Sequence, residues 1–243
     1  MSTALFVSPH LDDVVFSCGG TLAIMADAGW RTVMATCFTA TVLPATGFAL
    51  ACQLDKGLGP EVDYMALRRE EDRRAAAILG VTDLPWLDLP EAPHRGYANA
   101  PALFGDVHPD DDVWIALVER LRTLIADTAP DQIFAPQGLG NHVDHQHTIR
   151  ALQSVGTDIP IAWYRDTPYA IRDPAAPALV DAPVAATVPI GATLDRKIRA
   201  ACAYASQIGF QFGGPAGVAT ALTAFTAHEG GERFTGKLIL AAS

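Results

Sequence analysis

Short apolar, β-prone runs alternate along the chain with stretches that carry apolar side chains at helical spacing. The run Thr3 to Ser8 predicts a buried strand that ends before Pro9, and Arg31 to Phe38 predicts a second strand. Between them, the helix-prone stretch from Thr21 to Ala28 closes at Gly29. The pattern therefore predicts a strand, loop, helix and strand in this order at the start of the chain.

The same alternation continues in the rest of the sequence. Helices are expected at Met65 to Leu79, Asp110 to Ala126, about Asp144 to Val155 and Leu194 to Ser206, and strands at Leu84 to Leu87, Gln132 to Ala135 and Ile159 to Tyr164. The proline-rich stretches 88–109 and 167–189 are predicted as irregular loops, and the segment after Gly209 shows no clear period. Alternating strands and helices predict a mainly parallel sheet with helices on both faces. We therefore expect a single α/β domain over residues 1–243.

Composition supports a compact globular chain and limits its partners. Half of the 243 residues are hydrophobic and 18% are charged. The 17 basic and 27 acidic residues give a net charge of −10, which argues against unaided binding to nucleic acid or to an anionic membrane. The expected partner is a small molecule, and the sequence leaves open whether the chain forms a homo-oligomer.

Cysteine usage and the first residues favour a reduced, cytoplasmic protein. The four cysteines are far apart and form no Cys-x-x-Cys pair, which argues against a thiolate zinc site. The chain starts without a basic segment followed by a long apolar one, and no stretch of about 18 uninterrupted apolar residues occurs. Cytoplasmic localisation is therefore the expectation.

Two clusters of histidine and aspartate follow predicted strands. The first, SPHLDDVV, spans residues 8–15, and the second, GNHVDHQH, spans residues 140–147. Because the loops after parallel strands meet at one edge of a sheet, the clusters are predicted to be neighbours in space. Imidazole and carboxylate ligands suit zinc or iron, and a catalytic site uses three of them and leaves a position for water. Each cluster alone also fits a helix cap, but two together favour a bound metal.

These motifs resemble those of the LmbE-like or PIG-L N-acetylglucosaminyl deacetylases, zinc-dependent amidases that include the mycothiol and bacillithiol pathway deacetylases. Residues 9–14, PHLDDV, are similar to the family motif Pro-His-Pro-Asp-Asp-Glu, and residues 142–145, HVDH, to His-Pro-Asp-His. The resemblance extends to Arg68 with Glu71 and to Lys197 with residues 204–207, so it covers most of the chain. It implies a Rossmann-like (LmbE-like) fold and a hydrolase that removes an N-acyl group, N-acetyl in the family, from an amino sugar or its conjugate.

The resemblance also implies roles for the residues of the two motifs. His10, Asp13 and His145 would ligate Zn²⁺, with Fe²⁺ or another divalent metal as the alternatives. Asp12 would be the general base, because an aspartate beside the ligand is free to accept a proton from a water activated by the metal.

His142 would be the cationic partner that stabilises the oxyanion. Asp144, two residues further on, is expected to orient His142 and to raise its pKa. Either Asp12 or His142 could protonate the departing amine, and the sequence leaves this choice open.

Three further residues are candidates for substrate binding. Arg68 matches a family position near the sheet edge and could clamp the substrate, but it could equally pair with Glu71 one helical turn away. The thiol-pathway deacetylases place a tyrosine close to the second motif, and residues 138–141 contain none. Asn141 and Tyr164 are therefore the candidates for contacting the substrate carbonyl.

The sequence also leaves rival functions open. The same chemistry could act on another amide, such as a thiol conjugate or a natural-product intermediate, and two histidines with one carboxylate also occur in iron oxygenases. A metal-binding or carbohydrate-binding protein without turnover is a further alternative. Asp12 argues against it, because metal binding alone does not need a second carboxylate there.

Overall fold

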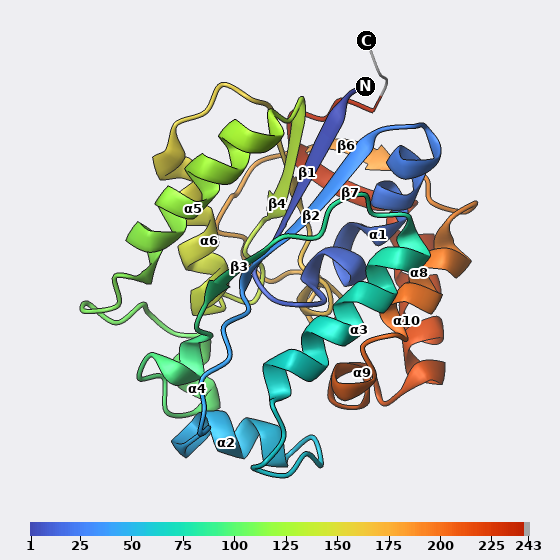
Figure 1. Cartoon of the computed structure of the whole chain (residues 1–243). Coiled ribbons are helices and arrows are strands. Elements are labelled where there is room, and N and C mark those ends of the chain that lie inside the picture. The colour runs from blue at the N-terminus through green and yellow to red at the C-terminus, as the bar shows by residue number, and fades with distance from the viewer. Residues whose placement is uncertain (241–243) are drawn as a thin grey trace.

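One seven-stranded sheet with the strand order β3-β2-β1-β4-β5-β7-β6 runs through the molecule (Figure 1). The computed structural model describes residues 1–240. The strands are β1 (Thr3–Ser8), β2 (Arg31–Phe38), β3 (Trp86–Leu89), β4 (Gln132–Pro136), β5 (Ile161–Tyr164), β6 (Val184–Val188) and β7 (Glu232–Gly236). The first five are parallel, whereas β7 is antiparallel to both β5 and β6. The predicted mainly parallel α/β fold is confirmed.

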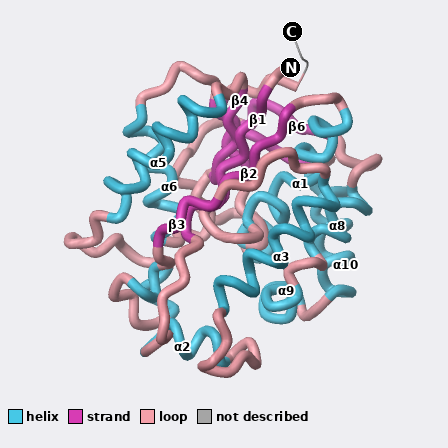
Figure 2. The backbone as a smooth tube through the Cα atoms, viewed as in Figure 1, coloured by secondary structure: helices cyan, strands magenta, loops and turns pink. Residues whose placement is uncertain are grey.

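Helices cover both faces of this sheet, as Figure 2 shows. They are α1 (Asp13–Asp27), α2 (Gly47–Leu54), α3 (Tyr64–Leu79), α4 (Ala100–Leu103), α5 (Val113–Thr128), α6 (Val143–Val155), α7 (Tyr169–Arg172), α8 (Leu194–Ala201), α9 (Ala205–Phe212) and α10 (Pro215–Glu229), with a 3₁₀ turn at Ala92–His94. Within residues 1–240, none of these helices combines the length and the apolar character needed to cross a lipid bilayer.

The side chains of β1 alternate between two hydrophobic cores. Ala4 and Phe6 belong to the core under α1, α3, α8 and α10, whereas Leu5 and Val7 belong to the core under α5 and α6 (Figure 1). Successive side chains of a strand point to opposite faces, so a strand covered on both sides must be apolar throughout. This is why β1 is a continuous apolar run in the sequence.

The strand order places both histidine motifs at one crevice. The chain leaves β1 toward β2 on one side and later returns to form β4 on the other side of β1. In open α/β sheets, ligands bind where the strand order reverses in this way, beyond the carboxyl ends of the strands. His10 follows β1 after Pro9, and His142 caps the amino end of α6 after β4.

The structure differs from the sequence prediction mainly in the irregular stretches. α1 begins at Asp13 rather than near Thr21 and contains a non-helical residue at Cys18. The predicted helix Leu194 to Ser206 is two helices, α8 and α9, and the stretches read as loops contain α4, α7 and β6. Elements of four or five residues carry too few positions to show a hydrophobic period, so only packing against the rest of the molecule reveals them.

Two adjacent glycines in α1 allow a matched test of packing. A Cβ atom at Gly20 would lie 2.8 Å from three side-chain atoms of Ile190, whereas a Cβ at Gly19 would meet Leu79 and Lys197 at 3.5 Å, an ordinary contact. We expect Gly20→Ala to lower the free energy of unfolding by about 1–3 kcal/mol through overpacking. Gly19→Ala should leave it unchanged or raise it by up to about 1 kcal/mol, because alanine favours a helix. Urea unfolding checks both, and equal effects would contradict the packing argument.

Candidate metal centre and active site

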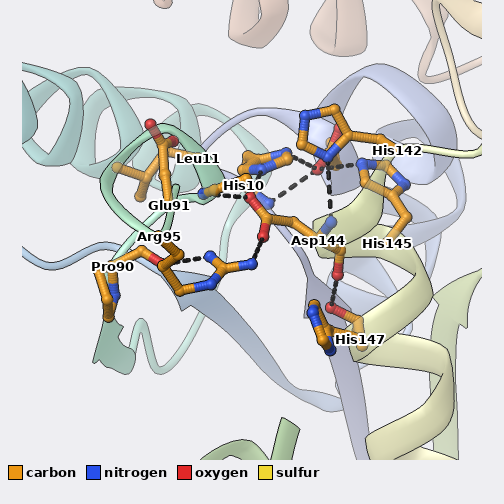
Figure 3. Close-up of polar contacts among 12 residues, drawn as sticks. His10, Leu11, Pro90, Glu91, Arg95, His142, Asp144, His145 and His147 are labelled. Atoms are coloured by element: carbon orange, nitrogen blue, oxygen red, sulfur yellow. Dashed lines mark hydrogen bonds and ion pairs between the residues drawn. The ribbon is translucent and has the colours of Figure 1, made fainter. Parts of the chain in front are cut away.

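The structure brings the two histidine motifs together around one pocket. His10, Asp12, Asp13, His142 and Asp144 all line a pocket of about 280 Å³ at the carboxyl end of the sheet. The ring centroid of His10 lies 4.8 Å from that of His142 and 5.4 Å from that of the fully buried His145 (Figure 3). Two segments more than a hundred residues apart in the sequence thus form one site.

Asp13 lies between two imidazoles. Its Oδ2 is 3.2 Å from His10 Nδ1 and 3.3 Å from His145 Nε2. Within the described part of the chain, His145 Nε2 is buried and has no hydrogen-bond partner. An orphaned buried nitrogen costs free energy, and this one faces a carboxylate and a second imidazole, which is a donor set for a divalent transition metal. The residues present therefore fit a metal ion.

His142 is close enough to share this centre. Donor nitrogens of His10, His142 and His145 all lie within 4.8 Å of one another. The geometry therefore offers two overlapping ligand sets, one that includes Asp13 and one that includes His142.

Two further carboxylates, those of Asp144 and Asp166, hold the imidazoles in place. Asp144 Oδ2 lies 2.9 Å from His10 Nε2, and Asp166 Oδ1 lies 2.6 Å from His145 Nδ1. Each contact occupies one ring nitrogen and leaves the other, His10 Nδ1 or His145 Nε2, to face Asp13. Carboxylates commonly fix metal-binding histidines in this way.

Asp12 is a second carboxylate in the pocket, next to Asp13 in the sequence. Its backbone has a φ of 140°, which is unusual for a residue other than glycine. The nearest cation is Arg68, whose Nη2 lies 3.7 Å from Asp12 Oδ2. Burial raises the pKa of Asp12 to about 8, although Arg68 acts in the opposite direction. A raised pKa makes the ionised carboxylate of Asp12 a stronger base, and the ionised form becomes the major one above about pH 8.

The carboxylate of Asp144 does not orient His142, although its charge acts to raise the pKa of His142 as expected. The carboxylate of Asp144 contacts His10 and Arg95 instead, and it is the backbone N–H of Asp144 that donates to His142 Nδ1 at 3.2 Å. Burial and the neighbouring His10 lower the pKa of His142 to about 3. The imidazole is therefore neutral rather than cationic, with Nδ1 as its acceptor nitrogen.

Arg68 lines the pocket, but its partner is not the one that helical spacing suggests. It forms an ion pair with Glu91 and donates to the Leu11 carbonyl at 3.0 Å, whereas Glu71 accepts hydrogen bonds from Ser206. The alternative of an Arg68–Glu71 pair is wrong, and a substrate contact by Arg68 stays a prediction.

Asn141 and Tyr164 do not line the pocket, and a substrate contact by either stays a prediction. Asn141 Nδ2 donates to the carbonyls of Phe104 and Gly105, so it fastens a neighbouring loop. Tyr164 is buried in the core and donates to the Val7 carbonyl at 2.9 Å. It is the last residue of β5, and its side chain packs in the hydrophobic core.

Several residues of the site carry no motif and were missed. Tyr169 lines the pocket with its ring centroid 5.8 Å from that of His145, so the loop after β5 supplies an aromatic hydroxyl that the residues before His142 lack. Asp166 lies two residues after the end of β5, just as His10 lies two residues after the end of β1. This position after a parallel strand is the feature of the sequence that could have identified Asp166 as a site residue. Glu91 lies in a proline-rich stretch where no sequence pattern marks it.

Comparison with known proteins finds deacetylases. The family model described as PIG-L, GlcNAc-PI de-N-acetylase, matches residues 5–155. The 2'-N-acetylparomamine deacetylase of Streptomyces fradiae is 32% identical over 214 residues, which are 84% of this chain and 72% of that protein.

Solved structures share the fold over nearly the full length. The zinc-inhibited form of teicoplanin deacetylase Orf2 has a TM-score of 0.80 at 23% identity and covers 96% of both chains. The A40926 pseudoaglycone deacetylase Dbv21 has a TM-score of 0.78 at 25% identity, with 99% of this chain and 98% of that one covered. At 23% identity, the similarity to teicoplanin deacetylase Orf2 shows that the two chains share a fold.

Proposed function

The chain belongs to the PIG-L family of de-N-acetylases, and from this we propose that it is a metal-dependent hydrolase that removes an N-acyl group from an amino sugar or amino-sugar conjugate. N-acetyl is the acyl group that the relatives' names support. The reaction would convert the amide and one water into a protonated amine and a carboxylate.

The observation that carries this proposal is the unpartnered Nε2 of His145 beside Asp13, with a second carboxylate, Asp12, in the same pocket. His10, Asp13 and His145 would hold the metal, with Zn²⁺ as the first candidate. A bound divalent cation would supply Lewis acidity, which polarises the amide carbonyl and lowers the pKa of a water molecule to about 7.

Asp12 and His142 have different roles beside the proposed metal site. Asp12 accepts the proton of the attacking water, and the same carboxyl can return it to the departing nitrogen, so that no net proton is lost. The neutral ring of His142 accepts at Nδ1, and Nε2 therefore carries the proton and is the donor for negative charge that develops on the carbonyl oxygen.

The walls of the pocket favour a sugar substrate. Tyr64, Phe104 and Tyr169 present aromatic surface, and the Arg68–Glu91 ion pair presents both charges and several hydrogen-bonding groups. Aromatic faces pack against the C–H faces of sugar rings, while charged side chains bind their hydroxyl groups. An N-acetylated amino sugar within a larger natural-product intermediate would fit this combination.

An amine-release assay tests the proposal. The metal-loaded protein is incubated with N-acetylglucosamine, with 2'-N-acetylparomamine and with an N-acetylated aliphatic amine, and free primary amine is measured over time. We expect release from at least one of the sugars and none from the aliphatic amine. A protein that binds metal but releases no amine from either sugar would contradict the proposed reaction.

Metal removal should be reversible. We expect dialysis against a chelator to abolish amine release, because no other group of the site can polarise the carbonyl comparably. Stoichiometric Zn²⁺ added back should restore it, whereas Mg²⁺ should not, since two imidazoles and one carboxylate suit zinc and not magnesium. Activity that persists in metal-free protein would contradict a metal-dependent mechanism.

A further inference from the structure

Arg95 contacts two carboxylates at once behind the pocket. It belongs to the proline-rich stretch between β3 and α5, and its side chain is only 9% exposed. Nη2 lies 2.7 Å from Asp144 Oδ1 and 3.0 Å from Asp111 Oδ2, and Nη1 donates to the Pro90 carbonyl at 2.6 Å. Arg95 lies outside both histidine motifs, and the mechanism above gives it no role.

Asp144 transmits this contact to the metal centre. Its second oxygen, Oδ2, lies 2.9 Å from His10 Nε2 and accepts from the Ala92 N–H at 3.1 Å. In Figure 3 the Asp144 carboxylate lies between Arg95 and His10. We propose that Arg95 is a positioning residue for the metal centre: it holds the Asp144 carboxylate in the orientation that binds His10 Nε2, so that His10 Nδ1 faces Asp13. This inference rests on the proposed metal site.

Arg95 is itself fixed from the far side. Asp111 accepts from Arg95 Nε at 3.1 Å, from the Tyr97 hydroxyl at 2.9 Å, and lies 2.9 Å from His147 Nε2. His147 and Asp144 are three residues apart on α6, so they share a face of that helix. The proline-rich stretch is thus clamped onto the helix that carries His145.

Loss of Arg95 would leave a buried charge only partly compensated. Asp144 is fully buried, and within residues 1–240 its Oδ1 has Arg95 as its hydrogen-bonding side chain. Without that partner, the carboxylate can turn toward other donors and release His10. A metal ligand whose orienting carboxylate is lost binds its metal about 10- to 100-fold more weakly.

The test compares Arg95→Met with Tyr97→Phe. Affinity for Zn²⁺ is measured by competition with a chromogenic chelator on metal-free protein, and the visible absorption spectrum of the Co²⁺-loaded protein reports ligand geometry. We expect Arg95→Met to bind Zn²⁺ about 10- to 100-fold more weakly than wild type and to show an altered Co²⁺ spectrum. Tyr97→Phe removes a hydroxyl that ties the same stretch to Asp111 but leaves the Arg95–Asp144 contact, so both readouts should match wild type.

The outcomes separate this inference from the proposed function. If the wild-type protein binds no Zn²⁺, the proposed metal site itself is contradicted. If Arg95→Met binds Zn²⁺ with wild-type affinity, only the role of Arg95 is contradicted. Equal losses in Arg95→Met and Tyr97→Phe would assign the effect to the stretch as a whole and would also overturn it. If circular dichroism shows that Arg95→Met does not fold, Asp111→Asn takes its place. It loosens Arg95 and should weaken Zn²⁺ binding to a smaller degree, and unchanged affinity would count against the proposal.

Discussion

Asp12→Asn is expected to retain one metal ion per chain and to lose about 100- to 10,000-fold in kcat. Asparagine has nearly the same shape as aspartate but cannot accept a proton from water. The pocket keeps its other groups, because the ligand candidates His10, Asp13 and His145 do not depend on Asp12 for their contacts. The measurement pairs metal analysis of the purified variant with amine release under saturating substrate.

A matched control separates the loss of the base from the loss of a negative charge. Asp110→Asn makes the same chemical change at an exposed position that does not line the site pocket, and it should behave as wild type. Asp12→Asn with wild-type kcat would show that another group takes the proton. A loss of metal in the same variant would instead place Asp12 among the ligands.

His145→Ala is expected to release the metal and to abolish amine release. His145 is fully buried between Asp13 and Asp166, so its removal takes away one ligand and leaves two carboxylates facing a cavity. Removing one partner of such a buried pair costs about 3–5 kcal/mol, so the variant should also unfold at a lower urea concentration. Metal analysis and urea unfolding measure the two effects separately.

The control for this variant is a histidine elsewhere in the chain. His94 is half-buried in the proline-rich stretch and does not line the site pocket, so His94→Gln should keep its metal. Full metal content in folded His145→Ala would reject this residue as a ligand and would favour His10 and His142 as the imidazole donors.

The sequence could predict the position of the site because that position follows from topology. Residues 9–13 directly follow a strand that is apolar throughout, and the second motif follows another, so parallel pairing of β1 with β4 brings both to one edge. The roles of the individual side chains were harder to predict. The partner of Asp144 is His10, which is 134 residues away, and no local spacing indicates such a pair.

The amino-acid sequence by itself determined the fold class, the two histidine motifs and the family, because each depends on local runs of residues: apolar segments for the strands, and a few adjacent side chains for the motifs. Only the tertiary structure decided which groups surround those motifs. Asp166, Glu91 and Arg95 reach the site from irregular segments and Tyr169 from the short helix α7. Burial together with His10 makes His142 neutral, and burial raises the pKa of Asp12. Desolvation and long-range contacts set these properties, and they exist only once the chain has packed.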